Sequence, residues 1–326
     1  MIYISFIIPC YNVADYLPDT IKSLRNLKDV DDCEFIFIND GSTDNTLDLL
    51  YQFAAEFPQA KIISQKNQGV SAARNAGLSN ATGQYLLFLD GDDCLKSDTI
   101  QIIKKHTGES DVLLTPITII QSNKQTESQL QLKEGEYSPI ALYKSCECFP
   151  TLPMLVYRTA IVKENNLHFS SDIHAGEVYT FTCEYLHFCK SIKVAHHSFY
   201  LYNIRPSSAT HSPNYAKDVT VLSAIDRIAT CSDPELLSIP SFTRTLFVLG
   251  ASFTYNKYAK FGLKDYQSLN TIQAMLSHQM FCYCMKKVAQ SFGKWHRDRI
   301  LAIYMITTGT WGYKLLATFM KILKRS

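Results

Sequence analysis

Three carboxylates stand together directly after an apolar segment. Residues 85–89 (Tyr-Leu-Leu-Phe-Leu) are typical of a buried strand, and Asp90, Asp92 and Asp93 follow them around a glycine. Clustered like charges repel one another, but they become favourable when a divalent cation lies among the oxygens. A metal held by only one or two carboxylates keeps positions open for phosphate oxygens. These residues therefore predict a place where a nucleotide diphosphate is held through a metal.

Two further apolar segments end in polar residues in the same way. Residues 6–8 run into Pro9-Cys-Tyr-Asn12, and residues 33–38 run into Asn39-Asp40. Segments with helical apolar spacing lie between the strands, and one of them carries Arg74. Alternating strands and helices predict a mostly parallel sheet with helices on both faces. Ligands of such sheets bind beyond the carboxyl ends of the strands, where these polar residues would gather.

Four motifs in register give the chain a family resemblance. FIIPCYN, NDGSTDNT, NQGVSAARNAG and FLDGDD follow one another within residues 1–95. This combination resembles the family 2 glycosyltransferases with the GT-A fold. The resemblance implies an α/β fold with a nucleotide-binding, mostly parallel sheet. A C-terminal helical segment is expected to follow, because the pattern beyond Pro213 is helical.

The resemblance also implies roles for individual residues. Asp90 would contact the ribose side of the donor, and Asp92 would ligate Mn²⁺ or Mg²⁺, with Asp93 as an adjacent carboxylate at the metal. Asp40 would read the uracil ring. The roles of four residues are thus implied, and two more, Pro9 and Tyr11, would pack near the base.

Alternatives remain open for two donor-binding candidates. Asp40 could instead shape the turn at Gly41-Ser42 as an Asx-turn residue. Arg74 could face the nucleotide or could be an ordinary surface charge on its helix.

The chain departs from the family where the catalytic base is expected. Members usually show a Glu-Asp pair at the start of a helix in the second half, with the Asp as base. Here Glu177 is followed by Val178, so the usual Asp is missing. Glu177 is the nearest carboxylate and the candidate base, although it could simply favour a helix N-terminus. Asp172 and His174 are reserve candidates.

A second arginine lies in a segment that resembles a family element. Residues 200–210 resemble the Tyr-rich segment, containing Arg and Ser, that follows the base helix. Arg205 could meet the diphosphate, with His211 nearby, or could form a structural salt bridge.

Composition limits the cellular setting. The chain has 326 residues, 46% of them hydrophobic, and a net charge of +2, which does not suggest nucleic-acid binding. Residues 286–326 carry nine Lys or Arg against one acid, beside many apolar and aromatic residues. Such a segment could lie in a membrane interface or pack on the catalytic domain. The start lacks a basic leader region, and no run of about 18 charge-free apolar residues occurs. We therefore expect a cytoplasmic protein, peripheral on the inner face of the cell membrane.

The patterns predict a division of the chain. Residues 1–210 would form the GT-A catalytic domain, with a nucleotide-binding half (1–106) and an acceptor half (107–210). Residues 211–326 would form a helical region that includes the basic tail. Residues 111–121 read as a strand or strand pair, and residues 191–202 alternate like one strand.

Together these features predict a metal-dependent, inverting hexosyltransferase. Its donor would be a nucleotide sugar, UDP-linked, and its acceptor a saccharide or a lipid-linked molecule in bacterial polysaccharide biosynthesis. The missing Asp leaves a non-catalytic sugar-nucleotide-binding or assembly protein as the alternative. A pyrophosphorylase is disfavoured because no Gly-rich basic phosphate loop follows the first strand, and a dehydrogenase because no G-x-G-x-x-G does.

Overall fold

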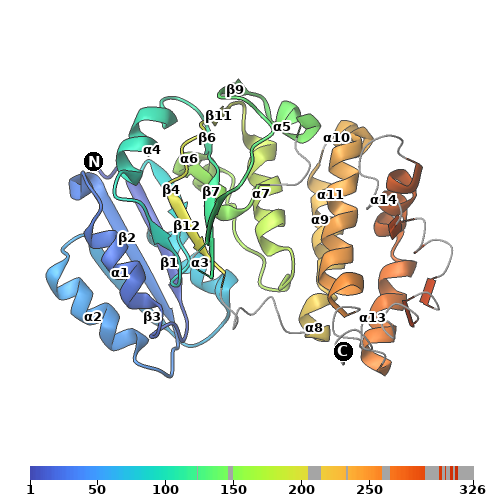
Figure 1. Cartoon of the computed structure of the whole chain (residues 1–326), viewed down its shortest axis with the longest axis horizontal. Helices are drawn as coiled ribbons and strands as arrows, with labels where there is room; N and C mark the ends of the chain where they lie inside the picture. The colour runs from blue at the N-terminus through green and yellow to red at the C-terminus, as the bar shows by residue number, and fades with distance from the viewer. Residues whose placement is uncertain are drawn as a thin grey trace. The chain divides into compact units, whose positions relative to one another are not determined.

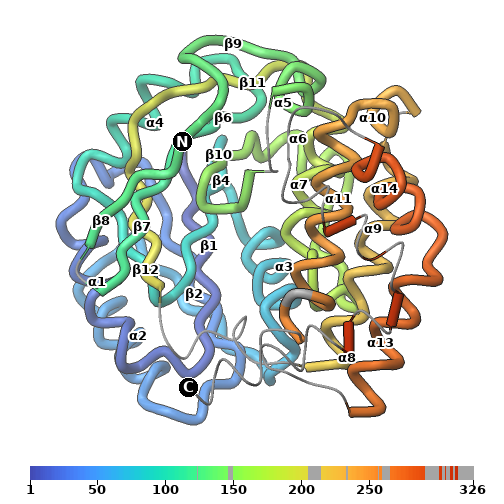
Figure 2. Tube along the Cα trace, turned by 45° about the vertical axis from the view of Figure 1, so that its right-hand side comes forward, coloured from blue at the N-terminus to red at the C-terminus, as the bar shows by residue number. Residues whose placement is uncertain are grey.

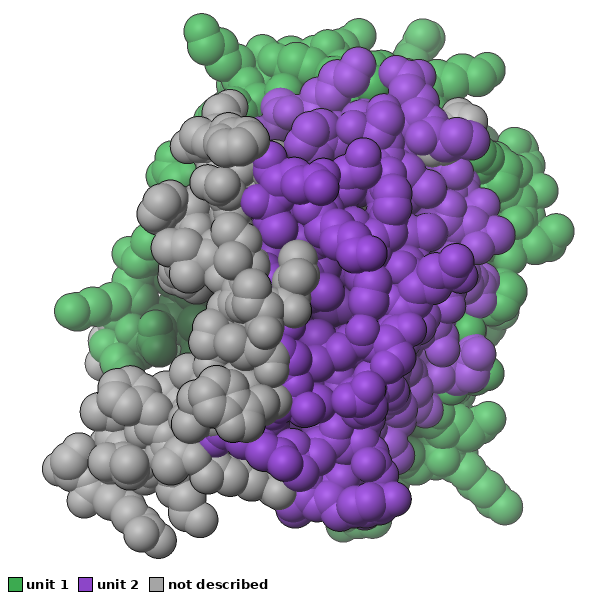
Figure 3. Space-filling view, turned by 90° about the vertical axis from the view of Figure 1, so that its right-hand side faces the viewer, with its two compact units in different colours: residues 1–142, 150–171, 185–206 green, residues 143–149, 172–184, 207–326 purple. Residues whose placement is uncertain are grey.

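The structure is a computed structural model that divides into two compact units (Figure 3). Unit 1 comprises residues 1–142, 150–171 and 185–206, and unit 2 comprises residues 143–149, 172–184 and 207–326. The structure describes residues 1–122, 124–145, 150–204, 214–232, 234–258 and 265–290, and beyond these residues 301, 302, 305, 309, 310, 313 and 314. The domain boundary expected at residue 210 stays a prediction.

Unit 1 is built on a mixed, mostly parallel sheet with the order β3-β2-β1-β4-β10-β6-β11-β9 (Figure 1). The first four strands in this order are mutually parallel, as expected. The antiparallel β10 then joins β4 to β6. The strands are β1 (Ile4–Cys10), β2 (Cys33–Asp40), β3 (Ala60–Gln65), β4 (Tyr85–Phe88), β6 (Val112–Leu114), β9 (Gly135–Tyr137), β10 (Leu155–Arg158) and β11 (Ile192–Val194).

Helices cover both faces of this sheet because alternate side chains point to opposite sides. Phe6 and Phe35 stack with ring centroids 4.7 Å apart, in a core that also holds apolar residues of α1 (Leu17–Arg25), α2 (Thr46–Glu56) and α4 (Thr99–Thr107). On the other face lies α3 (Val70–Asn80). A Cβ on Gly77 of α3 would stand 2.3 Å from Ile7 Cγ2, so only glycine lets this helix approach so closely. The expected layered α/β fold is confirmed.

A smaller second sheet has the order β5-β12-β7-β8. Its strands are β5 (Cys94–Leu95), β7 (Ile117–Gln121), β8 (Lys124–Glu127) and β12 (Tyr200–Asn203). Residues 111–121 form the predicted strand pair, β6 and β7. The single strand expected over 191–202 is wrong, because β11 and β12 belong to different sheets (Figure 2). The chain leaves the large sheet after Val194, where the His196 amide donates to Glu134 Oε1 (2.9 Å).

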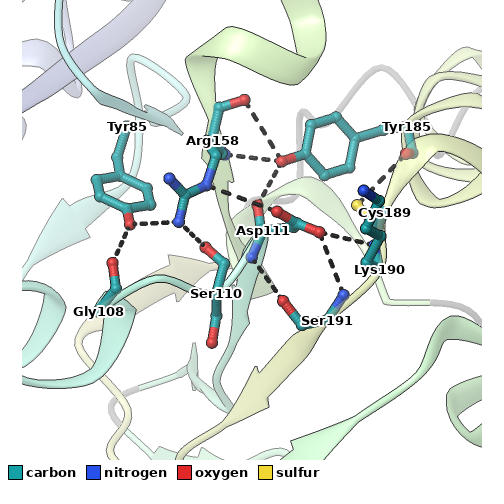
Figure 4. A network of polar contacts seen from close by, with 9 residues as sticks. All are labelled: Tyr85, Gly108, Ser110, Asp111, Arg158, Tyr185, Cys189, Lys190 and Ser191. Atoms are coloured by element: carbon teal, nitrogen blue, oxygen red, sulfur yellow. Dashed lines mark hydrogen bonds and ion pairs between the residues drawn. The ribbon is translucent and has the colours of Figure 1, made fainter.

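A partly buried polar network around Arg158 and Tyr185 joins β4, β10, α7 (Glu177–Phe188) and the residues just before β6 (Figure 4). Tyr185 Oη accepts a hydrogen bond from the Arg158 amide (2.7 Å) and donates one to the Asp111 carbonyl. Arg158 donates to the Ser110 carbonyl (2.9 Å) and to Tyr85 Oη (3.3 Å). The network gives the hydroxyls of Tyr85 and Tyr185 hydrogen-bond partners where β4, β6 and β10 meet, and Arg158 Nε lies 3.7 Å from Asp111 Oδ1, so it supports the fold.

Unit 2 contains the helices of the C-terminal region, as expected. Within it, α9 (Val221–Cys231), α11 (Pro240–Ala251) and α14 (Gln279–Gln290) pack on one another, and the ring centroids of Phe247 and Phe281 lie 5.6 Å apart. None of the helices in the described part of the chain combines the length and apolar character that a bilayer crossing requires. Most of the basic tail beyond residue 290 lies outside the described residues. The other helices among the described residues up to 290 are α5 (Pro139–Ser145), α6 (Thr159–Glu164), α7 (Glu177–Phe188), α8 (Tyr215–Asp218), α10 (Pro234–Ser238) and α13 (Tyr266–Ser277), with a π-helical turn at Ser252–Asn256.

Candidate functional site

The carboxylate turn, residues 90–93, follows β4 and is closed on itself. The Leu89 amide still donates to the Ile7 carbonyl (3.0 Å), and the Asp93 amide then donates to the Asp90 carbonyl (3.0 Å). Between them, Gly91 lies so close to β1 that a Cβ would stand 3.1 Å from Cys10 Sγ. Thr20 Oγ1 donates to the Gly91 carbonyl (3.0 Å). The turn therefore packs on the carboxyl end of β1 and is hydrogen-bonded to Thr20 of α1, and its place beyond the strand ends is the one that the strand pattern predicts.

The three acids of the turn differ in exposure. The Asp90 side chain is 38% exposed and Asp92 is partly exposed, whereas Asp93 is fully buried. The Asp93 carboxylate accepts hydrogen bonds from Tyr200 Oη (2.8 Å) and from the Asn203 amide (2.8 Å). Burial raises the pKa of Asp93 well above its usual range, and the charges of Asp90 and Asp92 raise it further.

Arg74 is a buried partner of this turn rather than a surface charge. Its side chain is 7% exposed, and Nη2 lies 3.2 Å from Asp90 Oδ1. Its guanidinium also lies 5.4 Å from the centroid of the Phe169 ring, within cation–π range. The structure thus brings two of the predicted donor-binding residues, Arg74 and Asp90, into direct contact.

Asp40 ends β2 and holds the loop that leads into α3. One carboxylate oxygen accepts from Gln65 Nε2 (2.8 Å) and the Gln68 amide (2.9 Å), and the other accepts from the Gly69 amide (2.8 Å). Both oxygens therefore shape the protein itself, but at residues 65–69 rather than at the expected turn of Gly41-Ser42, where Asn39 Oδ1 accepts from the Ser42 amide (3.2 Å). Its contact with a nucleobase stays a prediction.

The loops after β1 and β2 are tied together by their polar residues. Asn12, with a positive φ of 51°, donates its amide to Ser42 Oγ (3.1 Å) and accepts from the Thr43 amide (2.8 Å). Asp44 accepts from the Ala14 amide (3.0 Å). These bonds give the NDGSTDNT motif a structural role. Of the two base-packing candidates, Pro9 is partly buried and Tyr11 is 48% exposed.

The carboxylates of the turn are suited to a divalent cation that takes only one or two ligands from the protein. Among the described residues, no three His, Cys, Asp or Glu side chains are arranged to hold a metal ion. Mg²⁺ typically takes one or two carboxylates and completes its shell with water and phosphate oxygens, so such a group is not required. Both Asp93 oxygens are already hydrogen-bonded, which leaves Asp92, with Asp90 beside it, better placed to serve a metal.

Glu177 is the first residue of α7 and lies in unit 2, partly buried. The segment before it is fixed because Thr220 Oγ1 accepts from the amides of His174 (2.9 Å) and Ala175 (3.1 Å). Gly176 adopts a φ of 90° and so turns the chain into the helix. The role of Glu177 as base stays a prediction. Arg205 and His211 lie outside the described residues.

Sequence reasoning missed two residues that hold the turn, Tyr200 and Asn203. Tyr200 Oη accepts from the Asp90 amide (3.1 Å), and Asn203 Nδ2 donates to the Asp92 carbonyl (3.0 Å). Burial raises the pKa of the neighbouring Tyr202, and the three acids of the turn add to that effect. The spacing of polar and aromatic residues along 200–203 was the available signal, but their partners lie more than a hundred positions earlier.

Comparison with known proteins agrees with the motifs. Residues 5–166 match the family described as Glycosyl transferase family 2. An uncharacterized glycosyltransferase of Nostoc sp. is 36% identical over 169 residues, covering 49% of this chain and 52% of the relative. The chain thus spans about half the length of that relative.

Two solved structures resemble the whole chain. Residues 1–349 of TarS from S. aureus in complex with UDP-GlcNAc give a TM-score of 0.75 at 20% identity, covering 98% of this chain and 92% of that one. The mannosyltransferase PcManGT of Pyrobaculum calidifontis, in complex with GDP-Man and Mn²⁺, gives 0.54 at 13% identity, covering 99% and 88%. These likenesses establish a shared fold.

Proposed function

This chain belongs, through residues 5–166, to glycosyl transferase family 2, and we propose that it transfers a hexose from a UDP-sugar to a saccharide or lipid-linked acceptor. The observation that carries the proposal is the turn at residues 90–93, which sets Asp90 against a buried Arg74 at the carboxyl end of the sheet. The TarS complex with UDP-GlcNAc supports UDP as the nucleotide of the donor.

The reaction requires that the negative charge on the departing diphosphate be neutralised. A bound Mn²⁺ or Mg²⁺ would offset the charge that grows on the diphosphate as the sugar leaves. Asp92 would hold this ion, and Arg74 would keep Asp90 oriented toward the donor. Asp93, buried behind them, would hold the turn. The Mn²⁺ complex of PcManGT supports a divalent cation at this fold.

The acceptor hydroxyl must also lose a proton to a nearby base. We assign this role to Glu177. It would take the proton of the acceptor hydroxyl as that oxygen bonds to the anomeric carbon, from the face opposite the bond to the departing diphosphate, and such a single displacement inverts the configuration. Glu177→Gln should preserve UDP binding and lower transfer by about 10²- to 10⁴-fold. Glu164→Gln, at the exposed end of α6, is the control and should transfer at the wild-type rate. A fully active Glu177→Gln variant would move the search to Asp172 and His174.

A lipid-linked acceptor would place the reaction at the surface of a membrane. For a lipid-linked acceptor, the basic tail would bring the protein to the inner face of the cell membrane, and each Lys or Arg would contribute about 1 kcal/mol near anionic lipid. The full-length protein should then sediment with anionic liposomes and be partly released by salt. Protein that stays in the supernatant at low salt would contradict this part of the proposal.

The first test is thermal stabilisation by UDP-, GDP- and dTDP-sugars with and without Mn²⁺. A donor at 100 times its Kd should add about 2.7 kcal/mol of stability. Stabilisation by a UDP-sugar that needs the metal, followed by its hydrolysis or transfer, supports the enzyme. Binding without turnover would favour the non-catalytic alternative, and no binding of any nucleotide would reject both.

A further inference from the structure

The carboxylate turn is held by a strand from a different sheet. Tyr200 and Asn203 are the first and last residues of β12, which pairs with β5 on one side and with β7 on the other. Pairing on both sides therefore fixes the position of β12 in the second sheet. Residues 90–93 follow β4 in the large sheet and run directly into β5.

The two residues contact the turn through four hydrogen bonds. Tyr200 Oη accepts from the Asp90 amide and donates to the Asp93 carboxylate. Asn203 contributes its amide to the Asp93 carboxylate and its side-chain Nδ2 to the Asp92 carbonyl. Every acidic residue of the turn is therefore restrained through a bond to β12.

None of these four bonds from β12 goes to the carboxylate of Asp90 or Asp92. The bonds to Asp90 and Asp92 go to backbone atoms, whereas the carboxylate that β12 binds is the buried one of Asp93. Bonds to the backbone of a metal ligand fix where its side chain can reach, and the groups that position a ligand in this way affect how tightly the metal binds.

We infer that Tyr200 and Asn203 are positioning residues of the metal and donor site, which hold the carboxylate turn in its binding geometry before the ligands arrive. The inference rests on the proposed function. Loss of either support would let the turn relax under the mutual repulsion of its acids, so metal-dependent donor binding would weaken more than the fold does.

A purely structural role is the competing explanation, and Tyr185 offers a matched control for it. Tyr185 is also fully buried, and its hydroxyl also accepts from one backbone amide while donating to an oxygen, here of Arg158 and Asp111 respectively (Figure 4). Tyr185→Phe and Tyr200→Phe each remove one such hydroxyl from the interior of unit 1.

The experiment measures UDP affinity by calorimetry with and without Mn²⁺, together with the melting temperature. We expect Tyr200→Phe to lower the Mn²⁺-dependent affinity by about 10- to 100-fold. Tyr185→Phe should lower the melting temperature comparably and leave the UDP affinity unchanged. Equal UDP affinities in these two variants would overturn the role of Tyr200.

Asn203→Ala is a second and milder variant. If Tyr200→Phe does not fold, Asn203→Ala tests whether β12 positions the turn for Mn²⁺-dependent UDP binding. It keeps the backbone amide that binds Asp93 and removes the two side-chain bonds, to the Asp92 carbonyl (3.0 Å) and to Cys94 Sγ (3.9 Å). Asn165→Ala is its control, because Asn165 Nδ2 likewise donates to a carbonyl, that of Ile161 (2.9 Å). We expect a loss of about tenfold in Mn²⁺-dependent affinity for Asn203→Ala alone.

Different outcomes would reject the proposed metal-dependent function and the positioning role of Tyr200 and Asn203. Wild-type protein that binds UDP no better with Mn²⁺ than without it would reject the metal-dependent function, and the inference with it. Wild-type binding that responds to Mn²⁺, combined with unchanged binding by Asn203→Ala, would overturn the inference alone. A loss that is equal with and without Mn²⁺ would also overturn it, because a general structural defect does not distinguish the metal.

Discussion

Two buried carboxylates of unit 1, Glu34 near the start of β2 and Asp93 beyond the end of β4, are treated very differently by their surroundings. Glu34 is 3% exposed and accepts hydrogen bonds from Ser5 Oγ (2.6 Å), Lys61 Nζ (2.6 Å), and the amide (2.6 Å) and hydroxyl (2.8 Å) of Thr82. Asp93 is fully buried with two donors, and two further acids stand within three residues of it.

The pKa values of the two groups follow from these surroundings. Burial by itself would raise the pKa of Glu34, but its hydrogen bonds, that from Lys61 foremost, outweigh burial and lower the pKa to about 2. For Asp93, burial and the neighbouring acids together raise the pKa. The amino ends of the strands thus carry a charge that stabilises the fold. The carboxyl ends carry charges that cost stability, as expected of a binding site.

The largest expected effect tests the carboxyl end. Asp92→Asn should lower Mn²⁺-dependent UDP affinity by about 100-fold or more, because the ion loses a charged ligand while the acids repel one another less. Its melting temperature should stay the same or rise. Calorimetric titration of UDP with and without Mn²⁺ measures the first quantity and thermal unfolding the second. An unchanged response to Mn²⁺ would count against Asp92 as a ligand.

The mirror-image test is at the amino end. Glu34→Gln should lower the free energy of unfolding by about 2 kcal/mol, because Lys61 loses its charged partner and an amide group replaces one acceptor. UDP affinity should not change. Glu56→Gln is the control, since the Glu56 ion pair with Arg25 is largely exposed and should contribute less than about 1 kcal/mol. Weakened UDP binding in Glu34→Gln would erase the contrast between the two ends.

The lowered pKa of Glu34, at the amino end of β2, predicts that the free energy of unfolding falls in acid. Since the pKa of Glu34 is lowered from 4.5 to about 2, its stabilisation is present above the ordinary value and is lost as the pH falls toward the lowered one. The gap in unfolding free energy between wild type and Glu34→Gln should therefore narrow between about pH 5 and pH 2. Urea unfolding at a series of pH values measures it, and a gap that stays constant would contradict the assignment.

The strand ends of unit 1 were predictable because local pattern determines them. An apolar run followed by Asp or Asn marks the carboxyl end of a buried strand, and residues at the ends of neighbouring parallel strands must meet. This reasoning placed Asp40 and the turn at residues 90–93 correctly at the strand ends.

The partners of those residues were not predictable in the same way. Tyr200 and Asn203 bind a turn that lies about a hundred positions earlier, and only the pairing of β12 with β5 brings them there. For the same reason the sequence could not show that Asp92 is partly exposed whereas Asp93 is buried and hydrogen-bonded to β12. Adjacent identical residues differ in function only through which of them the fold buries.

The smallest expected effect is at Asp93 itself and decides whether its charge supports the fold as that of Glu34 does. Asp93→Asn keeps the shape and still accepts from the Asn203 amide, but it removes a buried charge beside two acids. The saved cost of burying that charge offsets the weaker bond to Tyr200, so the free energy of unfolding should change by less than about 1 kcal/mol. Chemical denaturation beside Glu34→Gln measures this directly. A loss as large as that of Glu34→Gln would mean that the hydrogen bonds to β12 outweigh the repulsion, and the two ends of the sheet would then use buried charge in the same way.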